Sequence, residues 1–135
     1  MTRHLFIFGL LCLASCASAK LEPTPVKDGM AQIVVKRMGS YVLLGTVFAS
    51  VEVNGTAAAR LGPDEIYTAD LPAGKTSIAV SGDLMPGRYV INFEAIAGKT
   101  YRFAVEPRGD SLGKIPSEFI PSEAGGSFHL RPFSG

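Results

Sequence analysis

The sequence is poor in the residues that bind transition metals and form covalent cross-links. It contains two cysteines, Cys12 and Cys16, and two histidines, His4 and His129. Of these four residues, only His129 lies beyond position 16. The chain after Cys16 therefore has no disulfide and no metal site of the usual cysteine and histidine composition, which leaves carboxylates as candidate ligands. We expect no metal and no cofactor, and a fold stabilised by burial alone.

The chain also lacks an excess or a run of charge of one sign. It has 13 Lys and Arg residues against 12 Asp and Glu residues, for a formal net charge of +1. Binding to nucleic acid needs a clustered basic face, and electrostatic binding to anionic lipid needs a basic patch. We therefore expect no nucleic acid partner and no basic membrane-surface patch.

The apolar run near the start of the chain is too short to cross a membrane. It covers residues 5–13, follows Arg3, and ends before Ser15, Ser18 and Lys20, whereas a transmembrane helix needs about 20 apolar residues. A charged start, a short apolar run and small residues are the three parts of a secretory signal peptide. We expect this segment to be cleaved.

The tetrapeptide Leu13-Ala14-Ser15-Cys16 at the end of this segment resembles the lipobox of bacterial lipoproteins. The resemblance implies that residues 1–15 are a lipoprotein signal peptide and that Cys16 carries acyl chains, such as palmitate, on its sulfur and amine. Two or more chains anchor a protein stably to a membrane. Ala17 stands where many inner-membrane lipoproteins have aspartate, so the resemblance points to the outer membrane, with the domain in the periplasm.

A second cleavage site competes with the lipobox. The residues Ala17-Ser18-Ala19 satisfy the A-x-A rule and would release a soluble protein that begins at Lys20. Against this alternative, an unmodified lone thiol at Cys16 would be a liability in an oxidising compartment, whereas a lipidated cysteine would not.

Residues 16–29 contain the lipidated cysteine and an expected tether, because Pro23 and Pro25 interrupt a stretch without apolar periodicity. From Met30 onward strand signals dominate, and no stretch keeps a 3.6-residue apolar period over three turns. Asn54-Gly55 between two alternating runs indicates a type I′ hairpin. We expect an all-β fold, a small antiparallel β-sandwich of about seven strands over residues 30–106. The expected strand segments are 33–35, 41–48, 48–53, 56–61, 65–71, 76–80, 88–95 and 100–105.

The remaining segment, 107–135, is rich in proline, glycine and serine, so we expect a loop-rich tail. Part of it should pack on the domain, because several of its residues are too apolar for a solvated tail, and 127–131 is a candidate edge strand. These apolar residues are Ile115, Phe119, Ile120, Phe128, Leu130 and Phe133.

Three short segments of the expected domain resemble a known family. They are Val51-Glu52-Val53-Asn54-Gly55, Leu71-Pro72-Ala73-Gly74-Lys75 and Ala97-Gly98-Lys99-Thr100-Tyr101. In this order they resemble the small β-sandwich domains of unknown function in bacterial lipoproteins, which are similar to PEGA-type and carboxypeptidase-regulatory-like modules. The resemblance implies a fold and carries no catalytic residue with it.

Two patterns that suggest catalysis or nucleotide binding are incomplete. Both Gly-Lys-Thr copies lack the earlier glycine of a phosphate-binding loop, since Ala69 and Phe93 stand there, and strands rather than helices should follow them. His129 has no G-x-S-x-G elbow to serve. We expect no nucleotide and no catalytic residue.

Together these patterns predict a membrane-anchored bacterial envelope lipoprotein that is not an enzyme, with a domain that binds or spaces an envelope protein or a glycan. The alternative is a soluble periplasmic accessory subunit, cleaved after Ala19, that binds peptide or glycan. Strand tyrosines are candidate contacts for such a ligand, because tyrosine combines rigid apolar area with a polar tip. They are Tyr41, Tyr67, Tyr89 and Tyr101.

Overall fold

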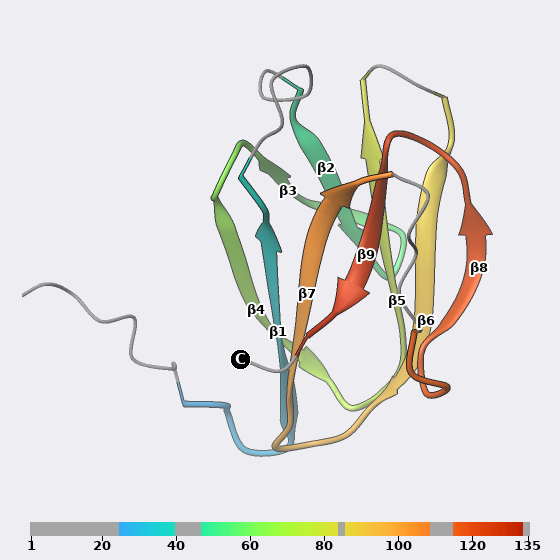
Figure 1. Ribbon diagram of the computed structural model, residues 1–135. Coiled ribbons are helices and arrows are strands. Elements are labelled where there is room, and N and C mark those ends of the chain that lie inside the picture. The colour runs from blue at the N-terminus through green and yellow to red at the C-terminus, as the bar shows by residue number, and fades with distance from the viewer. Residues whose placement is uncertain (1–24, 40–46, 84–85, 109–114, 134–135) are drawn as a thin grey trace, which may run out of the picture.

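A computed structural model describes residues 25–39, 47–83, 86–108 and 115–133 of the chain. Within these ranges the regular elements are nine β-strands in two sheets, so the all-β expectation is confirmed (Figure 1). The described part of the chain offers no helix with the length and apolarity needed to span a bilayer. The strands are β1 (Met30–Arg37), β2 (Ala49–Val53), β3 (Thr56–Leu61), β4 (Ile66–Pro72), β5 (Gly74–Gly82), β6 (Arg88–Ala95), β7 (Thr100–Pro107), β8 (Ile120–Ala124) and β9 (Phe128–Pro132).

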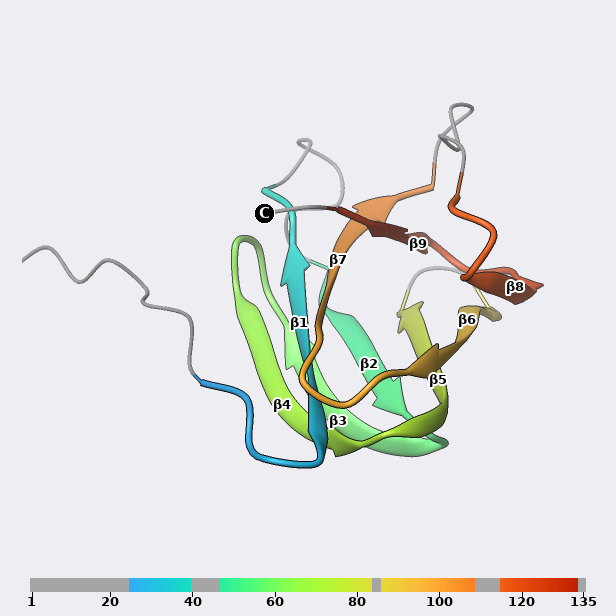
Figure 2. The ribbon, with the colours of Figure 1, turned by 90° about the horizontal axis from the view of Figure 1, so that it is seen from below.

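The two sheets form the layers of a sandwich-like arrangement (Figure 2). One sheet has the order β4-β1-β7-β9 and the other the order β3-β2-β5-β6-β8. β1 and β7 are parallel, with Gln32 opposite Thr100, and the other strand pairs are antiparallel. This corrects the expectation of a purely antiparallel sandwich. The parallel pair arises because the chain crosses to the other sheet and returns between β1 and β7, as parallel neighbours require.

The expectation of about seven strands over residues 30–106 is confirmed by β1 to β7, but the described residues after them form two more strands. The two last strands come from the segment expected to be a loop-rich tail, and they join different sheets. β9 coincides with the edge strand expected at 127–131, shifted by one residue. β8 contains Pro121 and has five exposed residues, so it has no alternating pattern that predicts a strand. Proline is tolerated there because β8 is an edge strand. The expected strand at 41–48 lies almost entirely outside the described residues.

The Asn54-Gly55 hairpin is confirmed. Both residues have positive φ, 50° and 79°, as a type I′ turn requires. The side chain of Asn54 also fixes the turn to the neighbouring strand, because its Oδ1 accepts a hydrogen bond from the Ser77 N–H at 2.9 Å. The hairpin is therefore part of the sheet rather than a free loop.

Both Ala-Gly-Lys-Thr segments pass the chain from one sheet to the other. The first links β4 to β5 through Ala73, and the second links β6 to β7 through residues 96–99. The second lies beside the start of β1, since the Gly98 N–H donates to the Met30 carbonyl at 2.8 Å. The start of the domain and the β6–β7 connection are therefore neighbours at one end of the sandwich.

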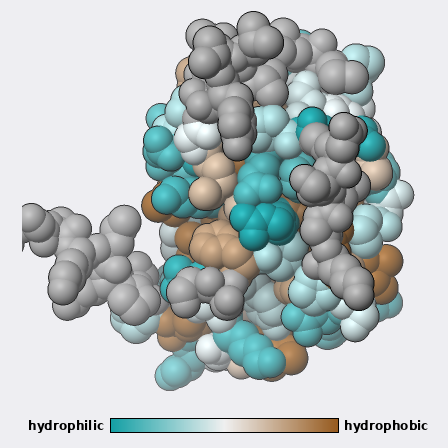
Figure 3. Space-filling model, in the orientation of Figure 1, coloured by the Kyte–Doolittle hydropathy of each residue, from teal (hydrophilic) through white to brown (hydrophobic). Residues whose placement is uncertain are grey.

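The core lies between the sheets and includes the last strand of the chain. Ile33 and Val35 of β1 are fully buried, as alternation predicts, and so are Phe128 and Leu130 of β9. On the outside, hydrophilic and hydrophobic residues are intermixed on the face seen in Figure 3. The remaining core residues are Ala31, Val47, Ala49, Val51, Leu61, Leu71, Ile78, Val80, Tyr89, Ile91, Phe93, Ala95, Phe103, Val105 and Phe119.

Candidate functional site

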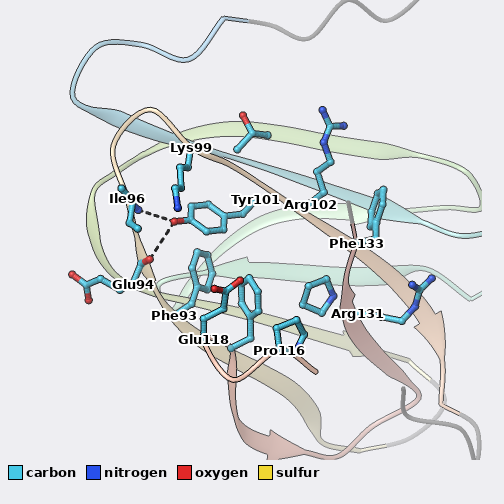
Figure 4. A pocket seen from close by; sticks show the side chains of 13 residues that line it. Phe93, Glu94, Ile96, Lys99, Tyr101, Arg102, Pro116, Glu118, Arg131 and Phe133 are labelled. Atoms are coloured by element: carbon cyan, nitrogen blue, oxygen red, sulfur yellow. Dashed lines mark hydrogen bonds between the residues drawn. The ribbon is translucent and has the colours of Figure 1, made fainter. Parts of the chain in front are cut away.

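A cleft of about 930 Å³ opens where β9 stops short of the full length of β7. β9 pairs with residues 103–107 of β7, and the last contact along this edge is the hydrogen bond from the Phe133 N–H to the Arg102 carbonyl at 3.0 Å. Below this point, among the described residues, β7 is paired with β1 alone. The cleft is lined by Phe93, Glu94, Ile96, Lys99, Thr100, Tyr101, Arg102, Pro116, Glu118, Phe119, Arg131, Pro132 and Phe133 (Figure 4).

The floor of the cleft is part of an aromatic cluster from three parts of the chain, of which Phe103 is fully buried behind the lining residues. Phe93 lies on β6, Tyr101 and Phe103 on β7, and Phe119 just before β8. The ring centroids of Phe93 and Tyr101 are 4.8 Å apart, and Phe119 lies 5.4 Å from Phe93 and 5.5 Å from Phe103. These distances are typical of tilted and edge-to-face aromatic pairs. The cleft therefore has a preformed apolar floor.

Tyr101 is held in place by two hydrogen bonds at the lip of the cleft. Its hydroxyl oxygen accepts the Ile96 N–H at 2.9 Å, and its O–H donates to the Glu94 carbonyl at 3.3 Å (Figure 4). Both partners are main-chain groups at the end of β6, so the ring position depends on the β6–β7 connection. These two hydrogen bonds restrict the rotation of the Tyr101 side chain, so its ring has a fixed position beside the cleft.

Charged side chains surround the opening. Lys99 and Arg102 are on the β7 side, and no described carboxylate forms an ion pair with either of them. The Glu94 side chain points away from the Tyr101 ring in Figure 4, whereas the Lys99 side chain runs toward its hydroxyl. Glu118 comes from the segment before β8. The β7 side of the cleft therefore has cationic groups available for a ligand.

A smaller hollow of about 520 Å³ adjoins the cleft on the other side of the segment before β8. It shares Phe93, Glu94 and Glu118 with the cleft and is lined also by Ile120. Ile120 is 63% exposed, the largest exposed fraction among the large hydrophobic residues described. The same end of the sandwich therefore combines both hollows and an exposed aliphatic side chain.

A group of polar residues, Glu106, His129 and Arg131, lies next to the cleft, where β7 and β9 pair. Glu106 accepts a hydrogen bond from Arg131 Nη2 at 2.7 Å, and His129 Nε2 lies 3.3 Å from the same carboxylate. The hydrogen bond from Arg131, aided by the charges of Arg131 and His129, lowers the pKa of Glu106. Arg131 lines the cleft but is already neutralised by this pair.

This polar group does not form a nucleophile and base pair. Ser127 Oγ and His129 Nδ1 are both buried, and neither has a hydrogen-bond partner among the described residues. A serine nucleophile and its histidine base need to be within hydrogen-bond reach of one another. In the described ranges there is also no group of three or more His, Cys, Asp or Glu side chains that could hold a metal ion.

The structure brings together only part of what the sequence analysis singled out. Cys16 and Tyr41 lie outside the described residues. Tyr89 is 1% exposed and belongs to the core, and Tyr67 is partly buried against it. The four tyrosines therefore do not line one binding face, and of those described only Tyr101 borders the cleft.

Sequence reasoning missed Phe119 and Phe133 as cleft residues. The available signal was the presence of large apolar residues in a segment otherwise rich in proline and glycine. This signal predicted that the residues pack on the domain, but not which strands they pack against. Their positions depend on which strands β8 and β9 join, and this pairing is not encoded in local sequence. Comparisons with protein-family models, with curated proteins and with solved structures gave no match to this chain.

Proposed function

We propose that this chain is a membrane-anchored lipoprotein of the bacterial envelope, and that its β-sandwich is a non-enzymatic binding module with the cleft as its binding site. The observation that carries the binding role is the cleft itself, with its preformed aromatic floor and the cationic groups on its β7 side. Concave sites with an apolar lining and a few polar groups are the usual form of ligand sites. The lipobox at Cys16 supports the anchor.

The cleft lies at the end of the sandwich where the tether enters. The Gln32 N–H, close to the start of β1, donates a hydrogen bond at 2.9 Å to the carbonyl of Lys99, which lines the cleft. Residues 17–29 separate Cys16 from this strand, and a chain of this length spans at most about 45 Å. On this proposal the cleft works within that distance of the membrane surface.

The anchor is tested by the intact mass of the mature protein extracted from membranes with detergent. We expect a chain that begins at Cys16 and carries acyl chains, and we expect a Cys16→Ala variant to lose the added mass and the membrane association. A chain that begins at Lys20 without modification would instead support the soluble periplasmic subunit, which the Ala17-Ser18-Ala19 motif favours.

The binding role is tested by site-specific photo-crosslinking in intact cells. A photo-reactive amino acid at Ile96, which lines the cleft and is 50% exposed, should give a discrete crosslinked product. The matched control is Ile66 of β4, which is 42% exposed and does not line the cleft. Equal products from both positions, or none from position 96, would contradict a binding role for the cleft.

A further inference from the structure

We propose that the cleft binds an extended, acidic peptide segment as an added strand along the lower half of β7. This inference rests on the proposed binding role of the cleft and specifies its ligand. The structural reason is the gap that the described residues leave in the four-stranded sheet, because β9 covers only residues 103–107 of β7. Extended peptides add to exposed sheet edges through main-chain hydrogen bonds and gain specificity from pockets for alternate side chains.

The main chain of Thr100 faces this gap. Gln32 of β1 is paired in parallel with Thr100, and its N–H donates a hydrogen bond to the neighbouring Lys99 carbonyl at 2.9 Å. In a parallel pair, a residue of one strand forms its hydrogen bonds with the two residues that flank its opposite number on the other strand. Gln32 therefore does not bond to Thr100, and the N–H and carbonyl of Thr100 point away from β1, toward the gap. Arg102, two residues further on, points its carbonyl to that same edge, where Phe133 meets it. Thr100 therefore offers one donor and one acceptor to an added strand.

The side chains around the gap define the sequence that would fit. Successive side chains of a strand point to opposite faces. Residues of an added strand that point inward with Tyr101 would meet the aromatic floor formed by Phe93 and Phe119. Those that point outward, with Thr100 and Arg102, would lie near cationic groups. The fitting ligand therefore alternates apolar and acidic residues.

Charge complementarity favours an acidic partner over a basic one. Lys99 and Arg102 have no ion pair with a described carboxylate, whereas the third cation of the cleft, Arg131, is 2.7 Å from a Glu106 oxygen. Two carboxylates also line the cleft: Glu118 belongs to the segment before β8, and the Glu94 side chain points away from the Tyr101 ring (Figure 4). Acidic side chains on the outer face of the added strand would pair with Arg102, and Lys99 lies at the end of the gap, where the β6–β7 connection meets β7.

The test uses the mature protein and a fluorescently labelled six-residue peptide in which glutamate alternates with valine and phenylalanine, with binding followed by fluorescence anisotropy. We expect saturable binding that weakens about tenfold or more when alternate backbone nitrogens of the peptide are methylated, because methylation removes the donors that pair with Thr100. This comparison needs no change in the protein. Replacing the glutamates with lysine should abolish binding.

Matched variants test the protein side. Thr100→Pro removes the N–H that faces the gap and should weaken binding about tenfold, while Thr100→Val keeps that N–H and should bind within about twofold of the wild type. Lys99→Glu, at an exposed position, should weaken binding of the acidic peptide, whereas Lys36→Glu, on β1 and outside the cleft lining, should not. Circular dichroism of each variant confirms that it folds.

Three outcomes separate the two proposals. Loss of binding on backbone methylation supports strand addition. Binding that is unaffected by methylation and by Thr100→Pro overturns strand addition but leaves the cleft as a binding site. Absence of peptide binding, with crosslinks from position 96 retained, overturns the peptide ligand and leaves a glycan as the ligand class to examine. Loss of those crosslinks, or equal crosslinks from position 66, counts against the proposed function itself.

Discussion

Arg37 is a charged residue that is buried in the core, where apolar residues are usual. It follows Ile33 and Val35 on the core face of β1 and is 2% exposed. Its guanidinium lies 5.2 Å from the centroid of the Phe128 ring, and Nη1 donates to the Leu61 carbonyl at 3.4 Å. Burial lowers the pKa of Arg37, but arginine remains charged in proteins. A cation over an aromatic face therefore closes this end of the core.

Glu106 gives a pH prediction at the same scale. The hydrogen bond from Arg131 is the largest cause of its lowered pKa. A carboxyl with a pKa lower in the folded than in the unfolded state stabilises the fold above its unfolded pKa of about 4.3. That stabilisation is lost as the pH falls through the lowered pKa. We therefore expect Glu106→Gln to reduce the free energy of unfolding at pH 7 and to differ less from the wild type at pH 2.

Urea unfolding at the two pH values measures this effect. The control is Glu94→Gln, because the Glu94 side chain is exposed and forms no ion pair with a described residue. A difference between Glu106→Gln and the wild type that stays constant with pH would show that the ion pair with Arg131 does not stabilise the fold.

At the scale of elements, the packing of β9 across β5 sets a strict limit on side-chain size. A Cβ atom at Gly82 would lie 2.7 Å from Phe128 Cε2 and 3.1 Å from Cδ2. Phe128 is fully buried beneath Arg37, so its ring has little room to move. The glycine is required here for close approach between sheets rather than for its backbone conformation.

We expect Gly82→Ala to lower the free energy of unfolding by about 1–3 kcal/mol, the usual cost of overpacking a core. The matched control is Gly62→Ala, whose added Cβ would be 3.4 Å from the Glu65 carboxylate, an ordinary contact, at a position without positive φ. Its effect should stay within about 0.5 kcal/mol. Equal effects of the two substitutions, measured by chemical denaturation, would show that Phe128 can move aside.

At the scale of the whole molecule, the segment after Pro107 completes both sheets. It supplies an edge strand to each sheet, and it contributes Phe119, Phe128 and Leu130 to the core. The sandwich is therefore not closed by residues 30–106 alone. A chain that ends at Pro107 would leave the aromatic cluster and the outer edges of β6 and β7 uncovered.

We expect a protein truncated after Pro107 to lose cooperative thermal unfolding and to aggregate, because exposed core surface and open strand edges favour association. A chain that ends at Phe133 should unfold like the full-length protein, since both last strands are retained. Circular dichroism during heating, with light scattering, measures both. A cooperative transition in the shorter chain would show that residues 30–107 fold independently.

Local patterns in the sequence were sufficient for several features of the fold. The Asn54-Gly55 hairpin follows from its dipeptide, because Asn-Gly is one of the few dipeptides that accept positive φ at both central positions of the turn. The strands from β3 to β7 follow from apolar and polar residues that alternate along segments bounded by glycine and proline turns. The lipobox at Cys16 stays a prediction, because it depends on a motif alone. Each of these depends on residues that are neighbours along the chain.

The parallel pairing of β1 with β7, the burial of Arg37 and the cleft were decided only by the tertiary structure. β8 has no apolar alternation, and its strand form depends on its pairing with β6. Among the described residues, the cleft lies where β9 ends at Pro132 while β7 extends to Thr100. These features arise from contacts between segments that are far apart in the sequence, and such contacts leave no periodic signal in either segment by itself.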